Sequence, residues 1–127
     1  MDDEHKNGYY IEPTIIINPK NDSPVVQEEV FGPVLTVQSF KTEEEAIELA
    51  NSTVFGLASG VWTQDINRGM RVARKLKAGT VWVNTYDRLL NEAETGGYRE
   101  SGIGRSGGQD GIKKFTEIKH VCIDFND

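Results

Sequence analysis

Over residues 34–84, stretches typical of strands take turns with stretches whose apolar positions recur with the period of a helix. This pattern predicts strands separated by helices. Residues 34–40, 57–63 and 80–84 are rich in apolar and β-branched side chains, as strands are. The two stretches between them repeat their apolar positions with a helical period. Short links between alternating strands and helices are typical of a parallel sheet with right-handed crossovers. We therefore expect an α/β fold built on a parallel βαβαβ sheet.

Each of the two predicted helices has a recognisable start. Thr42 precedes the first and Glu45 follows three residues later, which is the capping-box pattern. Asp65 precedes the second, and Gly79 is expected to cap its C-terminal end. The second helix presents an apolar face made of Ile66, Met70, Ala73 and Leu76.

After Asn84 the regular pattern ends in a glycine-rich stretch that runs to Gly111. A long ordered loop in a compact domain usually serves a function or an interface. Within it, residues 108–116 could form a short helix with Ile112 and Phe115 on one face. Residues 118–125 alternate apolar and polar side chains, which predicts a final strand.

Composition narrows the class of protein. The 127 residues fit one domain, and their 20 acidic against 14 basic side chains give a net charge of −6. This charge argues against nucleic-acid binding, which needs a basic surface. The longest purely apolar run, Ile15-Ile16-Ile17, is too short for a membrane span, which needs about 20 residues. The acidic first six residues lack a secretory signal and the lone Cys122 cannot form an internal disulfide, so we expect a cytoplasmic protein.

Two local motifs suggest other chemistry. Gly102, Gly104 and Gly107 match GxGxxG, but the dinucleotide-binding turn must follow a buried strand, and residues 96–101 predict none. A turn-rich loop is the better interpretation. His120 and Cys122 stand two apart in the predicted final strand, yet two ligands do not make a zinc site. We predict no metal site and no catalytic residue, and take Cys122 as a small apolar strand residue.

The sequence QEEVFGPV at residues 27–34 closely resembles the E-x-F-G-P block of the NAD(P)-dependent aldehyde dehydrogenase superfamily. Further blocks follow in the family's order: FGLA at 55–58, AGTVWVN at 78–84, GGY at 96–98 and SGIGR at 101–105. The resemblance covers residues 8–121. It implies that residues 1–117 form the distal, C-terminal part of the family's catalytic domain. Residues 118–127 would hold the C-terminal oligomerisation strand, which completes a sheet across a subunit boundary, and the tail.

The resemblance also implies roles for individual residues. Glu29 would accept hydrogen bonds from the nicotinamide ribose hydroxyls, and Phe31 would pack near the nicotinamide ring. The alternatives are an exposed surface carboxylate and a core aromatic. The aldehyde entrance of the family is lined by the loop after the third predicted strand, here with Leu89, Leu90, Glu94 and Thr95. Family members usually carry an aromatic residue where this chain has Thr95, so the resemblance leaves the aldehyde open.

In this family a cysteine thiolate attacks the aldehyde, hydride passes to the nicotinamide, and a glutamate activates water. The chain matches neither the cysteine block nor the general-base segment, so we expect it to be inactive alone and to bind no NAD or NADP by itself. The choice between the two cofactors lies with the family's Rossmann-like domain, which the resemblance does not cover.

Three hypotheses follow. The chain is a C-terminal fragment of an aldehyde dehydrogenase, or one half of a split enzyme that pairs with a complementary N-terminal half. Alternatively, it is a non-catalytic remnant that only self-associates. A free-standing nucleotide-binding module is the weakest of the three. Exposed strand edges and apolar faces predict a homo-oligomer, a dimer or larger.

Overall fold

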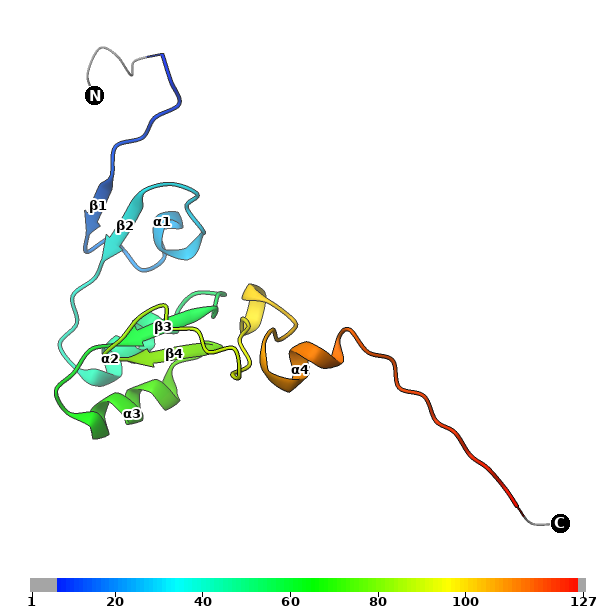
Figure 1. The fold of residues 1–127 in the computed structure, drawn as a ribbon. Coiled ribbons are helices and arrows are strands. Elements are labelled where there is room, and N and C mark those ends of the chain that lie inside the picture. Colours follow the sequence, from blue (N-terminus) through cyan, green and yellow to red (C-terminus); the bar gives the residue numbers. More distant parts are fainter. Residues whose placement is uncertain (1–6, 126–127) are drawn as a thin grey trace.

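The computed structural model describes residues 7–125. Figure 1 shows an α/β arrangement in which two small strand pairs are joined by α2, with a C-terminal segment running away from both. The elements follow in the order β1 (Thr14–Ile17), α1 (Pro24–Gln27), β2 (Val34–Val37), α2 (Glu43–Ala50), β3 (Ala58–Val61), α3 (Ile66–Lys75), β4 (Thr80–Val83), the 3-10 helix η2 (Arg99–Ser101) and α4 (Gly108–Lys113).

The strands form two separate parallel pairs, β1 with β2 and β3 with β4. The α/β class and the parallel pairing are confirmed, but the prediction of one βαβαβ sheet is wrong. The isoleucine run at residues 15–17 forms β1 and gives β2 a partner of its own, so β2 does not join β3 and β4. A helix connects the two strands of each pair, as parallel pairing requires.

The predicted helix starts are confirmed. The Thr42 hydroxyl accepts from the Glu45 backbone N–H at 3.1 Å, and the Lys41 N–H donates to the Glu45 carboxylate at 2.7 Å. The Asp65 carboxylate accepts from the N–H groups of Asn67 and Arg68 at 2.9 and 3.2 Å. These bonds satisfy donors that a helix N-terminus leaves without an intrahelical partner.

The predicted C-cap at Gly79 is wrong. Helix α3 ends at Lys75, and Leu76 caps it with extended backbone. Gly79 lies three residues farther on, where its Cα packs directly against the backbone of Gly96. A Cβ at Gly79 would overlap the Gly96 carbonyl oxygen, so close packing of two loops explains this glycine.

The first strand pair leaves an apolar face open to solvent. The register sets Ile15 opposite Leu35 and Ile17 opposite Val37, so the four side chains share one side of the sheet. Their exposed fractions are 63, 58, 64 and 41% respectively. We call this surface the bare face.

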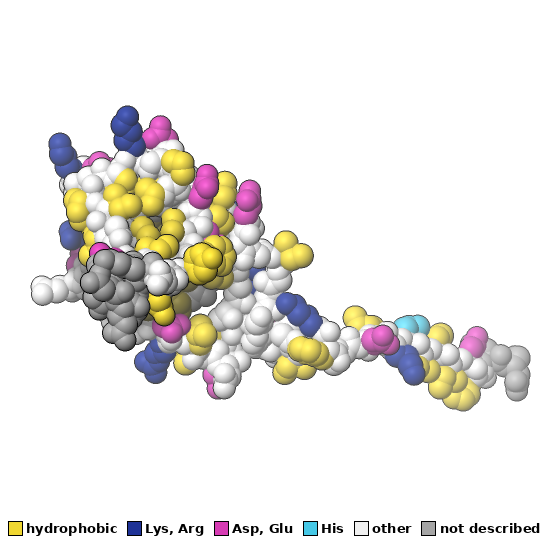
Figure 2. Space-filling view, turned by 90° about the horizontal axis from the view of Figure 1, so that it is seen from above, with side chains coloured by type: hydrophobic (Ala, Val, Ile, Leu, Met, Phe, Trp, Pro, Cys, Tyr) yellow, Lys and Arg dark blue, Asp and Glu magenta, His cyan; other side chains and the backbone are white. Residues whose placement is uncertain are grey.

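Apolar exposure extends beyond the bare face, as the yellow side chains in Figure 2 show. No hydrophobic side chain between residues 7 and 125 is fully buried. The accessible surface is 10790 Å², roughly 4,000 Å² more than the ~6,800 Å² that size scaling gives for a compact monomer of 14.2 kDa. Within the described residues the chain therefore forms local elements without a core of its own.

The predicted final strand is not formed in this structure. Residues 118–125 run outward from the region of α4 without strand pairing (Figure 1), and Ile118 and Phe125 are fully or almost fully exposed. A strand needs a neighbour for its N–H and C=O groups, and no strand of the described chain pairs with this segment. The short helix predicted before it is confirmed as α4, which ends at Lys113. No helix within residues 7–125 is long and apolar enough to cross a membrane.

Candidate functional site

The loop between α1 and β2 carries the two residues predicted to contact a cofactor. The Gly32 N–H donates to the Val30 carbonyl at 2.9 Å, and the Val34 N–H donates to the Gly32 carbonyl at 2.8 Å. These bonds close two successive three-residue turns. Phe31 is the middle residue of the first turn, and its ring is 92% exposed. In this chain Phe31 is therefore not a core aromatic.

Glu29 precedes the same turns and is also exposed. Its carboxylate has no hydrogen-bond or ion-pair partner within residues 7–125. Both carboxylate oxygens are thus able to accept hydrogen bonds from a ligand, and a carboxylate can accept from two adjacent hydroxyls. The loop thus carries a hydrogen-bond acceptor, Glu29, and an aromatic ring, Phe31, two positions apart. Both side chains are exposed.

The segment of residues 85–95, which we call the entrance segment, begins at a fixed point. Asn84 ends β4 in a left-handed conformation, with φ 56°. Its side-chain carbonyl accepts from the Thr63 N–H at 2.8 Å, and its amide donates to the Thr63 carbonyl at 2.9 Å. The Trp82 indole N–H donates to the Arg88 carbonyl at 3.0 Å, and its ring lies edge-on to Tyr86 at 5.1 Å.

The far end of the entrance segment is fixed by a two-bond bridge. Thr95 and Ser106 exchange backbone hydrogen bonds, each 2.7 Å long. Between the two ends, Leu89, Leu90 and Glu94 are exposed, and one Glu94 carboxylate oxygen is 3.5 Å from the Asp110 N–H. Of the four predicted entrance residues, three therefore lie on the exposed part of the segment and Thr95 belongs to the bridge at its end.

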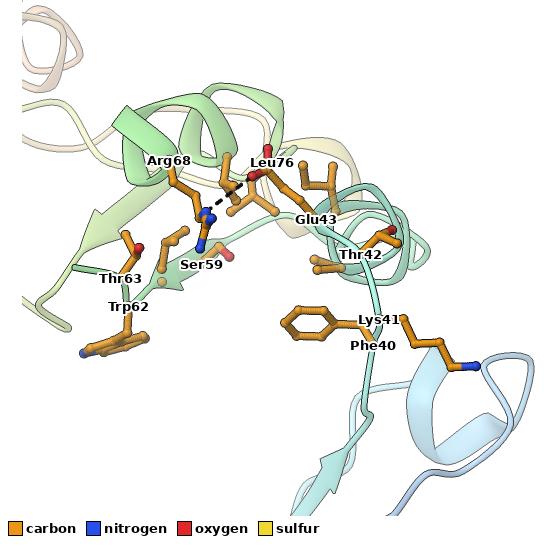
Figure 3. A pocket seen from close by; sticks show the side chains of 15 residues that line it. Phe40, Lys41, Thr42, Glu43, Ser59, Trp62, Thr63, Arg68 and Leu76 are labelled. Carbon is orange, nitrogen blue, oxygen red and sulfur yellow. Dashed lines mark ion pairs between the residues drawn. The ribbon is translucent and has the colours of Figure 1, made fainter. Parts of the chain in front are cut away.

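The loop that carries Glu29 and Phe31 and the entrance segment do not line a common cavity in this structure. A cavity of about 630 Å³ lies between α2, α3 and β3, and none of the six predicted site residues lines it. Figure 3 shows the side chains of its wall, among them Phe40 and Trp62, and the ion pair between Glu43 and Arg68. Glu43 is the only acidic residue of this wall, and it is held by arginines.

An ion pair joins α2 to α3 at this cavity. The Arg71 Nε and Nη2 atoms donate to the two carboxylate oxygens of Glu43, each at 2.7 Å, and Arg68 lies 3.8 Å away. The hydrogen bonds from Arg71, assisted by the positive charges nearby, lower the pKa of Glu43. Sequence analysis missed this pair because its members lie on different helices, where no spacing rule connects them. Because Glu43 begins α2 and Arg71 lies on α3, the ion pair links these two helices.

The remaining motifs take no part in a site. The GxGxxG match follows η2 and precedes α4, with no strand before it, so the turn-rich interpretation is confirmed. His120 and Cys122 lie exposed on the C-terminal segment. Within the described residues, no group of three or more His, Cys, Asp and Glu side chains could hold a metal ion.

Comparison with known protein families matches residues 1–121 to the Aldehyde dehydrogenase family. The chain belongs to this family. It is 52% identical over 120 residues to betaine aldehyde dehydrogenase of Bacillus subtilis. This match covers 94% of this chain and 24% of that protein. It is 44% identical over 126 residues to human 4-trimethylaminobutyraldehyde dehydrogenase, covering 99% of this chain and 26% of the relative.

Solved structures of family members share the fold of this aldehyde dehydrogenase chain. A crystal structure of Staphylococcus aureus betaine aldehyde dehydrogenase in complex with NAD⁺ superposes with a TM-score of 0.83 at 49% identity. The match covers 91% of this chain and 23% of that one. The family assignment from the sequence is therefore confirmed, and the chain spans about a quarter of the length of the relatives it matches.

Proposed function

We propose that this chain supplies the C-terminal portion of an NAD(P)-dependent aldehyde dehydrogenase, which oxidises an aldehyde to a carboxylic acid. The observation that supports the proposal is the exposed loop that carries Glu29 and Phe31. The bare face and the lack of a core within residues 7–125 support it, because both leave apolar surface for a larger body to cover.

The part played by this loop is cofactor orientation. The Glu29 carboxylate accepts from the two hydroxyls of the nicotinamide ribose, and the Phe31 ring covers one side of the nicotinamide. The cofactor, when bound, supplies the hydride acceptor. The two turn hydrogen bonds around Gly32 fix the backbone that carries Phe31.

The nucleophile and the general base come from the complementary N-terminal portion. Cys122 is exposed on the extended C-terminal segment, and its thiol forms no hydrogen bond within residues 7–125 that would activate it. The chain therefore contributes to cofactor orientation only when it is assembled with that portion. In the assembled enzyme its C-terminal segment would pair with a second subunit, giving a dimer or larger oligomer.

Aldehydes with a trimethylammonium group are the substrate class that we propose. Two relatives are named for such aldehydes, betaine aldehyde and 4-trimethylaminobutyraldehyde. On the entrance segment, Tyr86 offers an exposed aromatic face and Glu94 an exposed carboxylate. Aromatic faces and carboxylates both attract a quaternary ammonium group. Thr95 removes one aromatic that family members usually provide, so binding of this group should be weaker here.

Complementation tests the proposal. The chain is mixed with the part of Bacillus subtilis betaine aldehyde dehydrogenase that lacks the region matching this chain, and NADH formation is followed with betaine aldehyde. We expect no NADH from either part alone and turnover from the mixture. Absence of turnover at every mixing ratio would instead favour the alternative, a non-catalytic chain that only self-associates through the bare face. Turnover by the chain alone that survives Cys122→Ser would overturn both.

A further inference from the structure

Three loops meet beside the C-terminal ends of α2 and α3, and we call their meeting point the junction. It comprises residues 51–56, 77–79 and 96–101. Asn51, the residue after α2, bonds to the end of α3 with both atoms of its amide: Nδ2 donates to the Lys75 carbonyl at 2.9 Å, and Oδ1 accepts from the Lys77 N–H at 2.7 Å. One side chain thus ties the two helix ends together.

Gly56 joins the third loop to the other two. Its carbonyl accepts from the N–H groups of Gly79 and Tyr98 at 3.0 and 2.8 Å, and its own N–H donates to the Ser101 hydroxyl at 2.9 Å. Gly56 is buried, and a Cβ there would overlap the Lys77 carbonyl oxygen. The glycine loop that follows the entrance segment is therefore held by backbone hydrogen bonds at a point where no side chain would fit.

Arg99 closes the junction with its side chain. Its Nη1 atom donates to the carbonyls of Asn51, at 3.0 Å, and of Thr53. Its backbone has φ 51°, a left-handed conformation that an arginine rarely adopts. Such a conformation persists where the surroundings determine it, and here the two carbonyls bound by the guanidinium supply that constraint.

We propose that Arg99 is a positioning residue for the aldehyde entrance, an inference that rests on the proposed function. Arg99 lies four residues after Thr95, so the junction holds the chain just beyond the Thr95–Ser106 bridge, while Asn84 fixes the upstream end of the entrance segment. Leu89, Leu90 and Glu94 are exposed between these ends, where the Asn91 carbonyl and the Glu94 carboxylate also accept from the N–H groups of Gly108 and Asp110. Loosening the junction would shift the downstream side of this segment, and neither Glu29 nor Phe31 belongs to the junction.

Two substitutions separate the side-chain bonds from the backbone conformation. Arg99→Lys keeps a single nitrogen that can donate to both carbonyls, as Nη1 does. Arg99→Gly accepts the left-handed backbone without strain but removes the donor. Arg74→Ala on α3 is the matched control, because it removes an exposed arginine that makes no bond at the junction.

Hydrogen exchange on the full chain is the first readout. For Arg99→Gly we expect the hydrogen-bonded amides of Thr95, Tyr98 and Glu100 to exchange about tenfold faster, because the segment has lost one anchor. For Arg99→Lys and Arg74→Ala we expect rates within about twofold of the original chain. Faster exchange in Arg99→Lys with unchanged exchange in Arg99→Gly would overturn the proposal, since it would assign Arg99 a backbone role. Unchanged exchange in both would also overturn it.

The mixed enzyme described above gives the second readout. Arg99→Gly is expected to raise the KM for the aldehyde about tenfold, with kcat and the KM for NAD⁺ within about twofold, because only the entrance is misplaced. Equal losses in all three constants would contradict a role at the entrance. If the original mixture shows no turnover, the proposed function fails by itself. The exchange rates then still decide whether Arg99 fixes the entrance segment.

Discussion

Replacing Ile15 with lysine is expected to weaken any association that covers the bare face. Covering an aliphatic side chain of this size completely is worth about 1.5–3 kcal/mol. Ile15 is 63% exposed, so its remaining burial is worth about 1–2 kcal/mol, and that of all four side chains together about 3–7 kcal/mol. Losing the free energy of burying Ile15 raises the dissociation constant about 5- to 30-fold. The cost of desolvating the lysine charge adds to this increase.

Thr14→Lys is the matched control. Thr14 is the neighbour of Ile15 on β1, so its side chain points to the other side of the sheet. Both substitutions place the same charged residue in the same exposed strand, and only one of them alters the bare face. Any difference between the two variants therefore reports on that face and is independent of strand propensity.

Sedimentation equilibrium over a dilution series measures the self-association of the three chains, and titration with the complementary enzyme portion measures their heterologous binding. Ile15→Lys should shift both equilibria toward the free chain, while Thr14→Lys leaves them near the original values. Equal shifts in the two variants would refute the assignment of the bare face as the association surface. So would a monomeric original chain at every concentration that also fails to bind the complementary portion.

Three further outcomes are expected. Thr42→Ala removes the hydroxyl that accepts from the Glu45 N–H, so the free energy of unfolding of the mixed enzyme should fall by about 1 kcal/mol, measured by urea titration of that mixture with Thr42→Ser as the control that keeps the hydroxyl. The pKa of Glu43 is lowered from its usual 4.5 by hydrogen bonds from Arg71, so the stability from this pair is present above pH 4.5 and is lost as the pH falls through the folded-state pKa. Glu43→Gln should therefore flatten the fall of the urea midpoint in acid, and an unchanged slope would show that the pair contributes nothing. Thr95→Trp should lower the KM of the mixed enzyme for betaine aldehyde about 2- to 30-fold relative to an uncharged aldehyde, because a cation over an aromatic face gains about 0.5–2 kcal/mol; equal changes for both aldehydes would exclude the cation–aromatic contact.

The features that could be predicted from sequence are those set by neighbouring residues. The caps at Thr42 and Asp65 are examples, because a cap needs only a side chain and the N–H groups two or three residues later. Pairing between distant strands was not predictable in this way. The three consecutive isoleucines show no alternation of apolar and polar residues, so they did not predict a strand. They nevertheless form most of β1, which pairs with β2, so β2 does not join the expected sheet.

At the C-terminal segment the sequence instead predicts a strand that the structure does not form. Its alternating side chains predict a strand, but alternation cannot supply the neighbouring strand that pairing requires, and residues 118–125 remain unpaired here. For the candidate site, the resemblance selected Glu29 and Phe31, and their roles remain predictions that the exposed loop supports. The bonds of Arg99 to Asn51 and Thr53 had no signal, since they join loops more than forty residues apart.

The central claim is that this chain orients the nicotinamide cofactor through Glu29. The most direct test is the KM for NAD⁺ of the mixed enzyme with Glu29→Gln, which keeps the size of the side chain but removes the charge that strengthens its bonds to two ribose hydroxyls. We expect the KM for NAD⁺ to rise about tenfold or more, with the KM for the aldehyde unchanged. An unchanged KM for NAD⁺ in an active mixture would contradict it.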